Sequence, residues 1–242
     1  MYSIETSLLT KKYKDVTAVD GLDLEIYNGE IFSLLGVNGA GKTTTIRMLT
    51  GLTEPTSGAA LVGGYSLGKD ADKIKEIIAI SPQETAVAPG LTVRENLELI
   101  AGLFAFTKDR SAKRINELCD VFGLSSVLDK RAGKLSGGWQ RRLSIAMALL
   151  SEPEILFLDE PTLGLDVIAR SELWDVIRSL KGKATVILTT HYMEEAEALS
   201  DRIGIMKEGR LLTVGTASEI MDMTGKSRFE DAFISVVKGV TV

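Results

Sequence analysis

Short apolar runs alternate with longer segments of helical periodicity along the chain. Several of the runs are apolar at every position, which is typical of strands whose two faces are both covered by helices. These runs are residues 31–35, 77–80, 155–158, 186–188 and 203–206. The helical segments between them are residues 42–50, 93–105, 112–122, 138–150 and 168–180. The alternation predicts an α/β fold with a mainly parallel sheet.

Two regions depart from this alternation. Residues 3–10, 23–27 and the Gly-rich 57–64 indicate short strands that form an antiparallel layer beside the parallel sheet. Residues 84–150 are mostly helical and contain no convincing strand. We therefore expect one composite unit over 1–242, with an α/β core from residues 1–83 and 151–242 and an inserted helical subdomain from residues 84–150.

Composition narrows the class of protein. Hydrophobic residues make up 45% and charged residues 25% of the 242 positions, which excludes disordered and fibrous chains. The net charge of −5 argues against a nucleic-acid binder that works through bulk positive charge. The single cysteine, Cys119, cannot form an internal disulfide and fits a reducing compartment. No apolar run approaches the ~20 residues of a membrane span, so we expect a cytoplasmic chain.

The strongest local motif is Gly-Val-Asn-Gly-Ala-Gly-Lys-Thr at 36–43, which follows a predicted strand and opens a predicted helix. Its glycines let backbone N–H groups approach phosphate oxygens, and the helix N-terminus adds further donors. Lys42 would neutralise phosphate charge, and the Thr43 hydroxyl would ligate Mg²⁺. The alternative is a Gly-rich turn with a surface lysine. The motif predicts that a nucleoside triphosphate contacts Gly36, Asn38, Gly39, Ala40, Gly41, Lys42, Thr43 and Thr44.

Two acids, Asp159 and Glu160, end the apolar run 155–158. An acid at the carboxyl end of a parallel strand faces the crevice where such sheets bind ligands. Asp159 would hold Mg²⁺, directly or through water, and Glu160 would polarise the attacking water as general base. A solvated strand end has the same pattern, but the phosphate loop favours the catalytic interpretation.

The segment Leu-Ser-Gly-Gly-Trp-Gln at 135–140 resembles the signature of ATP-binding-cassette (ABC) ATPases. In that family a glutamine commonly follows the two glycines directly, whereas here Trp139 intervenes and Gln140 comes one place later. The core Ser136-Gly137-Gly138 is intact and opens a predicted helix, so anion binding is expected to survive.

Further segments between residues 13 and 191 carry the same resemblance. Tyr13 is similar to the aromatic residue that stacks on adenine, and Gln83 to the glutamine that senses Mg²⁺ and the transport partner. Gly164-Leu165-Asp166 resembles the loop that crosses the dimer interface, and His191 the switch histidine at the γ-phosphate. Taken alone, Tyr13 also fits a surface aromatic and His191 a structural histidine.

The resemblance implies a P-loop NTPase (RecA-like) fold that uses ATP and Mg²⁺. It implies catalytic roles for Lys42, Gln83, Glu160 and His191. It implies nucleotide contacts by Tyr13, Ser136, Gly137, Gly138 and Asp166 in addition to the phosphate loop. It implies metal ligation by Thr43, Gln83 and Asp159.

The resemblance also implies two partners. A second ATPase chain, the same chain or a close paralogue, would close its signature over the nucleotide of the first. An integral membrane subunit would dock near residues 83–106, where residues 86–91 are apolar. The alternative is that the apolar side chains there pack the helical region itself: Leu97, Leu99, Leu103, Phe104 and Phe106.

Residues 190–197 and 228–233 resemble the exporter branch that handles drugs, antimicrobial peptides, polysaccharides or lipids. The expected function is therefore the ATP-hydrolysing subunit of an exporter, peripheral on the inner face of the cell membrane. Two alternatives remain open: the ATPase of an importer, and a soluble ABC ATPase without a pore, such as one in iron–sulfur assembly.

Overall fold

Two β-sheets form the framework of the molecule. The computed structural model describes residues 1–239. Its larger sheet has the strand order β10-β9-β3-β8-β7-β6, and its smaller sheet the order β2-β1-β4-β5. The strands are β1 (Tyr2–Tyr13), β2 (Val16–Tyr27), β3 (Ile31–Leu35), β4 (Ser57–Val62), β5 (Tyr65–Ser66), β6 (Ile78–Ser81), β7 (Ile155–Asp159), β8 (Thr185–Thr190), β9 (Arg202–Lys207) and β10 (Arg210–Gly215).

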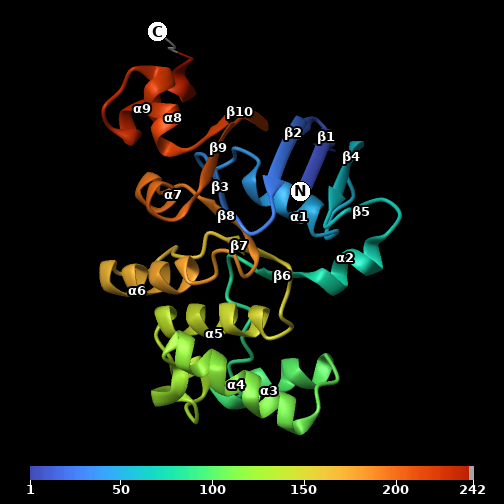
Figure 1. The fold of residues 1–242 in the computed structure, drawn as a ribbon, viewed down its shortest axis with the longest axis vertical. Coiled ribbons are helices and arrows are strands. Elements are labelled where there is room, and N and C mark those ends of the chain that lie inside the picture. The colour runs from blue at the N-terminus through green and yellow to red at the C-terminus, as the bar shows by residue number, and fades with distance from the viewer. Residues whose placement is uncertain (240–242) are drawn as a thin grey trace.

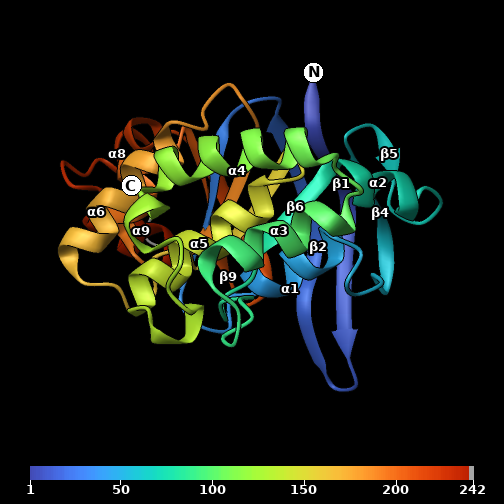
Figure 2. The same cartoon turned by 90° about the horizontal axis from the view of Figure 1, so that it is seen from below.

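The larger sheet is parallel except at one edge. β3 lies between β8 and β9 and pairs in parallel with both, and β7 pairs in parallel with β8 and β6. Only β10 runs antiparallel, beside β9. Every residue of β3, β7 and β8 is buried, as expected when helices cover both faces of a sheet. The smaller sheet is antiparallel, and Figure 2 shows β1 and β2 as a long hairpin. The predicted fold class is confirmed.

Nine α-helices complete the described part of the chain. They are α1 (Lys42–Leu49), α2 (Ala71–Ile77), α3 (Val93–Leu103), α4 (Lys108–Phe122), α5 (Gly137–Leu149), α6 (Val167–Arg178), α7 (Met193–Leu199), α8 (Ala217–Thr224) and α9 (Phe229–Lys238). Figure 1 shows α3, α4 and α5 together at one end of the molecule, with α8 and α9 at the other. Within residues 1–239, no helix is long and apolar enough to cross a membrane.

The helical region and the parallel sheet share one hydrophobic core. Leu97 of α3, Phe122 of α4 and Leu143 of α5 belong to the same buried cluster as Leu156 and Leu158 of β7. This shared cluster joins the helical region to the sheet, and one composite unit over residues 1–242 stays a prediction. The division at residues 83 and 150 stays a prediction, and residues 240–242 of the predicted core lie outside the described residues.

The pattern of apolar positions did not predict α2, α7, α8 or α9. The helices α2 and α7 span only seven residues each, which is too short for a helical period to stand out. Because α2 ends at Ile77, the strand predicted over 77–80 begins one residue later. The first strand also runs further than predicted, to Tyr13.

Candidate active site

The candidate site lies at the carboxyl edge of the parallel sheet. The loop 36–41 follows β3, Gln83 follows β6, Glu160 follows β7 and His191 follows β8. The carboxyl ends of neighbouring parallel strands meet at one edge, where α/β sheets bind ligands. Residues from all four segments line one cavity of 760 Å³, together with Val16, Thr17, Ala18, Asn38, Gly39, Ala40, Gly41, Lys42, Thr43, Thr44, Leu163 and Glu208.

The loop between β3 and α1 depends on glycine at two positions. A Cβ at Gly36 would lie 2.5 Å from the Met206 carbonyl oxygen. At Gly41, where φ is +104°, a Cβ would lie 2.6 Å from the Ala18 carbonyl oxygen. No other residue fits such close approaches. The loop therefore delivers the first turn of α1, with its unpaired N–H groups, to the cavity wall, where they suit phosphate oxygens.

Lys42 is a buried cation at this wall, with 5% of its surface exposed. Its Nζ donates to the carbonyl oxygens of Gly36 at 2.6 Å and Val37 at 3.2 Å. Burial lowers the pKa of Lys42, and the nearby carboxylates of Glu160 and Asp159 oppose that shift. Because Nζ also lies 3.8 Å from Glu160 Oε1, the ammonium group sits between the phosphate loop and the proposed general base.

Asp159 and Thr43, both predicted metal ligands, are in direct contact. Thr43 Oγ1 donates to Asp159 Oδ1 at 3.1 Å, and Thr189 Oγ1 donates to the same oxygen. Within residues 1–239 no group of three or more His, Cys, Asp or Glu side chains is arranged to hold a metal. The donor set fits Mg²⁺, which takes one or two protein oxygens and completes its shell with phosphate and water.

Glu160 sits in a strained turn directly after β7. Its φ of 47° is left-handed, a conformation that costs about 1–3 kcal/mol for a non-glycine residue. The Glu160 N–H donates to the Thr189 hydroxyl at 3.0 Å and to the Thr189 carbonyl at 3.1 Å, which secures the turn. Its Oε2 lies 3.2 Å from His191 Nδ1. The turn thus aims the carboxylate between Lys42 and His191.

Several predicted nucleotide contacts do not line this cavity, and Gly36 is one of them. Among the described residues that line it, Ser136, Gly137, Gly138 and Asp166 are absent. Ser136 is the N-cap of α5. Asp166 is the N-cap of α6, where its side chain accepts bonds from the N–H groups of Ile168 and Ala169. The nucleotide-contacting role of these residues stays a prediction.

Tyr13 also lies outside the lining. It stands at the end of β1 with 44% of its surface exposed, and Lys11 Nζ lies 5.0 Å from its ring centroid. Val16, at the start of β2, does line the cavity. Stacking of Tyr13 on adenine stays a prediction.

Arg141 is a functional candidate that the sequence did not indicate. Its side chain is 3% exposed and donates to the carbonyl oxygens of Pro82 at 2.6 Å, Gln83 at 2.5 Å and Glu160 at 3.4 Å. Burial lowers the pKa of Arg141. Nothing in the local sequence marks this arginine, because its acceptors come from two distant loops. Thr189 was also missed, although a hydroxyl at the end of an apolar strand is a detectable signal.

The displaced glutamine, Gln140, has a structural role. Its Nε2 donates to the carbonyl oxygens of Ala132 at 3.1 Å and Leu135 at 3.2 Å, which holds the loop before α5. Trp139 is partly buried, with the Arg142 guanidinium 5.1 Å from its ring. The segment therefore keeps its shape without glutamine at position 139.

Sequence comparisons match this chain to one family of proteins. The family model described as ABC transporter matches residues 19–163. The daunorubicin/doxorubicin resistance ATP-binding protein DrrA of Streptomyces peucetius is 41% identical over 253 residues, which covers 99% of this chain and 77% of that protein. The linearmycin resistance ATP-binding protein LnrL of Bacillus subtilis is 40% identical over 223 residues, 92% of this chain and 72% of that protein.

Solved structures of ATP-binding subunits are also similar to this chain. The ATP-binding subunit of an ABC transporter matches with a TM-score of 0.86 and 29% identity, over 96% of this chain and 98% of the other. A dimeric ATP-binding cassette in a post-hydrolysis state, bound to ADP and Pi, matches with a TM-score of 0.79 and 27% identity. That match covers 88% of this chain and 98% of the other.

Proposed function

The chain belongs to the ABC transporter family as an ATP-binding subunit and ATPase, and we propose that it drives export through a separate membrane subunit. The names of two relatives support the direction, since both are resistance ATP-binding proteins. Export of a compound out of the cell is the transport direction that resistance requires. The structural observation that supports ATP hydrolysis in this proposal is the carboxylate of Glu160, held between Lys42 and His191 at the wall of the cavity.

We assign the hydrolytic steps to the residues around this cavity. The loop 36–44 binds the phosphates, and Lys42 neutralises their charge. Thr43 and Asp159 would hold Mg²⁺ with Gln83 nearby, and the ion would supply further charge neutralisation. Glu160 accepts the proton of the water that attacks the γ-phosphorus as the bond to the bridging oxygen breaks. His191 lies beside both Glu160 and the cavity, where it contacts the γ-phosphate.

A second ATPase chain completes the site in this proposal. Ser136, Gly137 and Gly138 open α5 but lie outside the lining of the cavity of their own chain. The dimeric, ADP- and Pi-bound neighbour supports a head-to-tail pair in which each signature closes over the other chain's nucleotide. Closure excludes water and adds donors around the phosphates. The partner is a second copy or a close paralogue.

The membrane subunit docks near residues 83–106. Leu97 is fully buried and Phe106 packs against the core, so these two side chains belong to the helical region itself. Leu99, Leu103 and Phe104 are 48%, 74% and 49% exposed. An exposed apolar cluster of this kind suits a partner helix. Docking there would place the chain at the inner face of the membrane.

The test is affinity purification from native membranes in mild detergent, followed by mass spectrometry. We expect a polytopic membrane protein to be recovered with the wild-type chain. Leu103→Asp/Phe104→Asp should lose this partner, whereas Val121→Asp, at an apolar position of α4 that is 50% exposed, should keep it. Recovery of soluble partners only would contradict the exporter proposal and leave the ATPase chemistry intact.

A further inference from the structure

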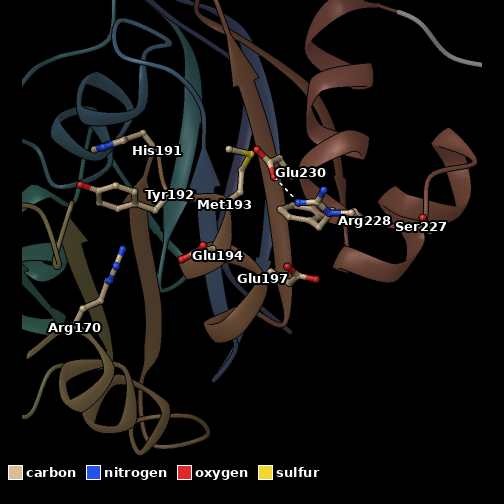
Figure 3. Close-up of a pocket in the computed structure, with 10 residues that line it drawn as sticks. Arg170, His191, Tyr192, Met193, Glu194, Glu197, Ser227, Arg228 and Glu230 are labelled. Carbon is tan, nitrogen blue, oxygen red and sulfur yellow. Dashed lines mark hydrogen bonds and ion pairs between the residues drawn. The ribbon is translucent and has the colours of Figure 1, made fainter. Parts of the chain in front are cut away.

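His191 belongs to two cavities. Besides the nucleotide cavity, it lines a second one of 590 Å³ between the end of β8, α6, α7 and the start of α9. Figure 3 shows this second cavity and the side chains that line it. His191 thus borders open space on two sides while its side chain is 27% exposed, so the contacts on its ring determine where the imidazole points.

Hydrogen bonding does not hold this ring. His191 Nδ1 is buried and has no hydrogen-bond partner within residues 1–239, although Glu160 Oε2 lies 3.2 Å away. The distance is within hydrogen-bond range, but the direction of the ring N–H does not meet the geometry of a hydrogen bond. A ring without such a bond is free to turn about its side-chain torsions unless its faces are packed.

The face of the imidazole is packed by the next residue, Tyr192. The two ring centroids lie 4.1 Å apart with an interplanar angle of 41°. The Arg170 guanidinium carbon lies 5.5 Å from the centroid of the Tyr192 ring. Figure 3 shows the three side chains one above another, with Tyr192 in the middle. Aromatic contact and cation–π attraction both favour this arrangement.

The backbone on both sides of this column is fixed. Tyr192 N–H donates to the Thr190 hydroxyl at 3.0 Å, and the Tyr192 carbonyl accepts from Ala196 at the start of α7 at 3.2 Å. Arg170 N–H donates to the Asp166 carbonyl at 3.0 Å in the first turn of α6. The main chain that carries the tyrosine and arginine side chains is therefore held in place on both sides of the stack.

We propose that Tyr192, clamped by Arg170, is a positioning residue that holds the His191 imidazole beside Glu160. The proposal rests on the proposed function, in which His191 and Glu160 act together on the γ-phosphate and the attacking water. Misplacement of a reacting group by about 1 Å can cost about 100-fold in rate. The support of one ring by another therefore controls turnover without touching the nucleotide.

The first experiment uses the fact that His191 is the only histidine of the chain. Protein with ¹³C,¹⁵N-labelled histidine and no polyhistidine tag gives a single imidazole signal. We expect Tyr192→Phe to keep its chemical shift near that of wild type, because the contact involves the ring, and Tyr192→Leu to move it toward that of free histidine. Tyr65→Leu is the matched control: Tyr65 is also partly buried, with Lys73 Nζ 5.3 Å from its ring.

The second experiment is a double-mutant cycle on ATP turnover. Tyr192→Leu should lower kcat about 10- to 100-fold, with KM for ATP within about twofold of wild type. Tyr192→Phe should keep at least half of the wild-type kcat. In a His191→Ala background, Tyr192→Leu should lower kcat less than about twofold, because the residue it positions is gone. Arg170→Gln should also lower kcat. It replaces Tyr192→Leu in the experiment if the leucine variant does not fold.

Three results would overturn the proposal: an unmoved imidazole signal in Tyr192→Leu, a wild-type kcat in that variant, or an equal loss of kcat with and without His191. A His191→Ala variant that turns over ATP at the wild-type rate would instead remove the role of His191 from the proposed function. In that case the positioning role is refuted as well. The imidazole signals of wild type and Tyr192→Leu would still report whether the two rings stack.

Discussion

The guanidinium of Arg141 lies 2.5 Å from the backbone carbonyl oxygen of Gln83. The same side chain also reaches the carbonyls of Pro82 and Glu160. One buried cation in the helix that begins at the signature segment thus joins two loops of the candidate site. In the proposed function these are the loop next to the membrane subunit and the turn that aims the general base. A shift of α5 would therefore be felt in both loops.

Arg141→Met should destabilise the protein and slow hydrolysis. The substitution leaves buried carbonyls without donors, which costs about 1–3 kcal/mol each, and it relieves part of that cost by removing a buried charge. We expect the free energy of unfolding in urea to fall by about 1–3 kcal/mol and kcat to fall with it. Arg178→Met, at a side chain that is 46% exposed, is the control and should change stability by less than about 0.5 kcal/mol. Equal stability of the two variants would contradict the structural role.

Glu160→Gln should retain ATP binding but lose turnover about 100-fold or more, because the amide cannot accept the proton of the attacking water. In the presence of ATP the variant should accumulate as a dimer, measured by light scattering after size exclusion. Glu208→Gln alters another side chain that lines the same cavity and should hydrolyse ATP normally. A wild-type rate in Glu160→Gln would refute the assignment of the base.

Gly137→Ala tests whether the signature segment 135–140 acts within one chain or across a pair of chains. A Cβ at Gly137 meets nothing within 4 Å, and alanine in a helix is favoured over glycine by up to about 1 kcal/mol. The melting temperature should therefore equal or exceed that of wild type, and ATP binding by the monomer should be unchanged.

In the Glu160→Gln background, the same Gly137→Ala change should abolish the ATP-dependent dimer, because in the proposed dimer a second chain occupies the open space. Gly102→Ala, a glycine of α3 whose Cβ also meets nothing, should leave the dimer intact. Normal dimer formation and turnover in Gly137→Ala would argue that no partner approaches this residue.

Glu195 should make stability depend on pH. It is fully buried, its Oε1 accepts bonds from Thr162 at 2.8 Å and Trp174 at 3.1 Å, and its Oε2 has no partner within residues 1–239. Burial raises the pKa of this carboxyl above its ordinary value of 4.5. Between 4.5 and the raised pKa the folded state binds more protons than the unfolded state, so the free energy of unfolding falls as pH rises.

The measurement is urea unfolding of wild type and Glu195→Gln from pH 5 to pH 8. The advantage of the glutamine variant over wild type should grow with pH, since glutamine does not ionise. Glu197→Gln, on the exposed face of the same helix, controls for the loss of a surface charge and should run parallel to wild type. Parallel curves for Glu195→Gln and wild type would contradict the raised pKa.

The parallel core was predictable from the sequence because its strands are buried on both faces. Residues 31–35 are apolar at four of five positions and form β3 over those same residues. The short helices were not predictable in this way. α7 buries only one side of two turns, and its buried Glu195 looks like a surface acid in the sequence.

The candidate site was predictable where one motif carries the chemistry. The loop 36–43 and the pair Asp159-Glu160 meet as expected, since both follow strands of one sheet. The residues that hold this loop and these acids in position were not predictable. Arg141 and Tyr192 act through backbone carbonyls and a ring from other segments, and such contacts depend on tertiary packing that has no local period.

The position of β3 has a consequence for biosynthesis. Its two hydrogen-bonding neighbours, β8 and β9, come from residues 185–190 and 202–207. The phosphate loop is thus translated before both neighbours of its strand, which gains no hydrogen-bonding partner until residues 185–190 have been made. Even the family-matched segment 19–163 lacks both neighbours. A nascent chain halted before residue 185 would expose the edges of an apolar strand, so nucleotide affinity should arise late and all at once during synthesis.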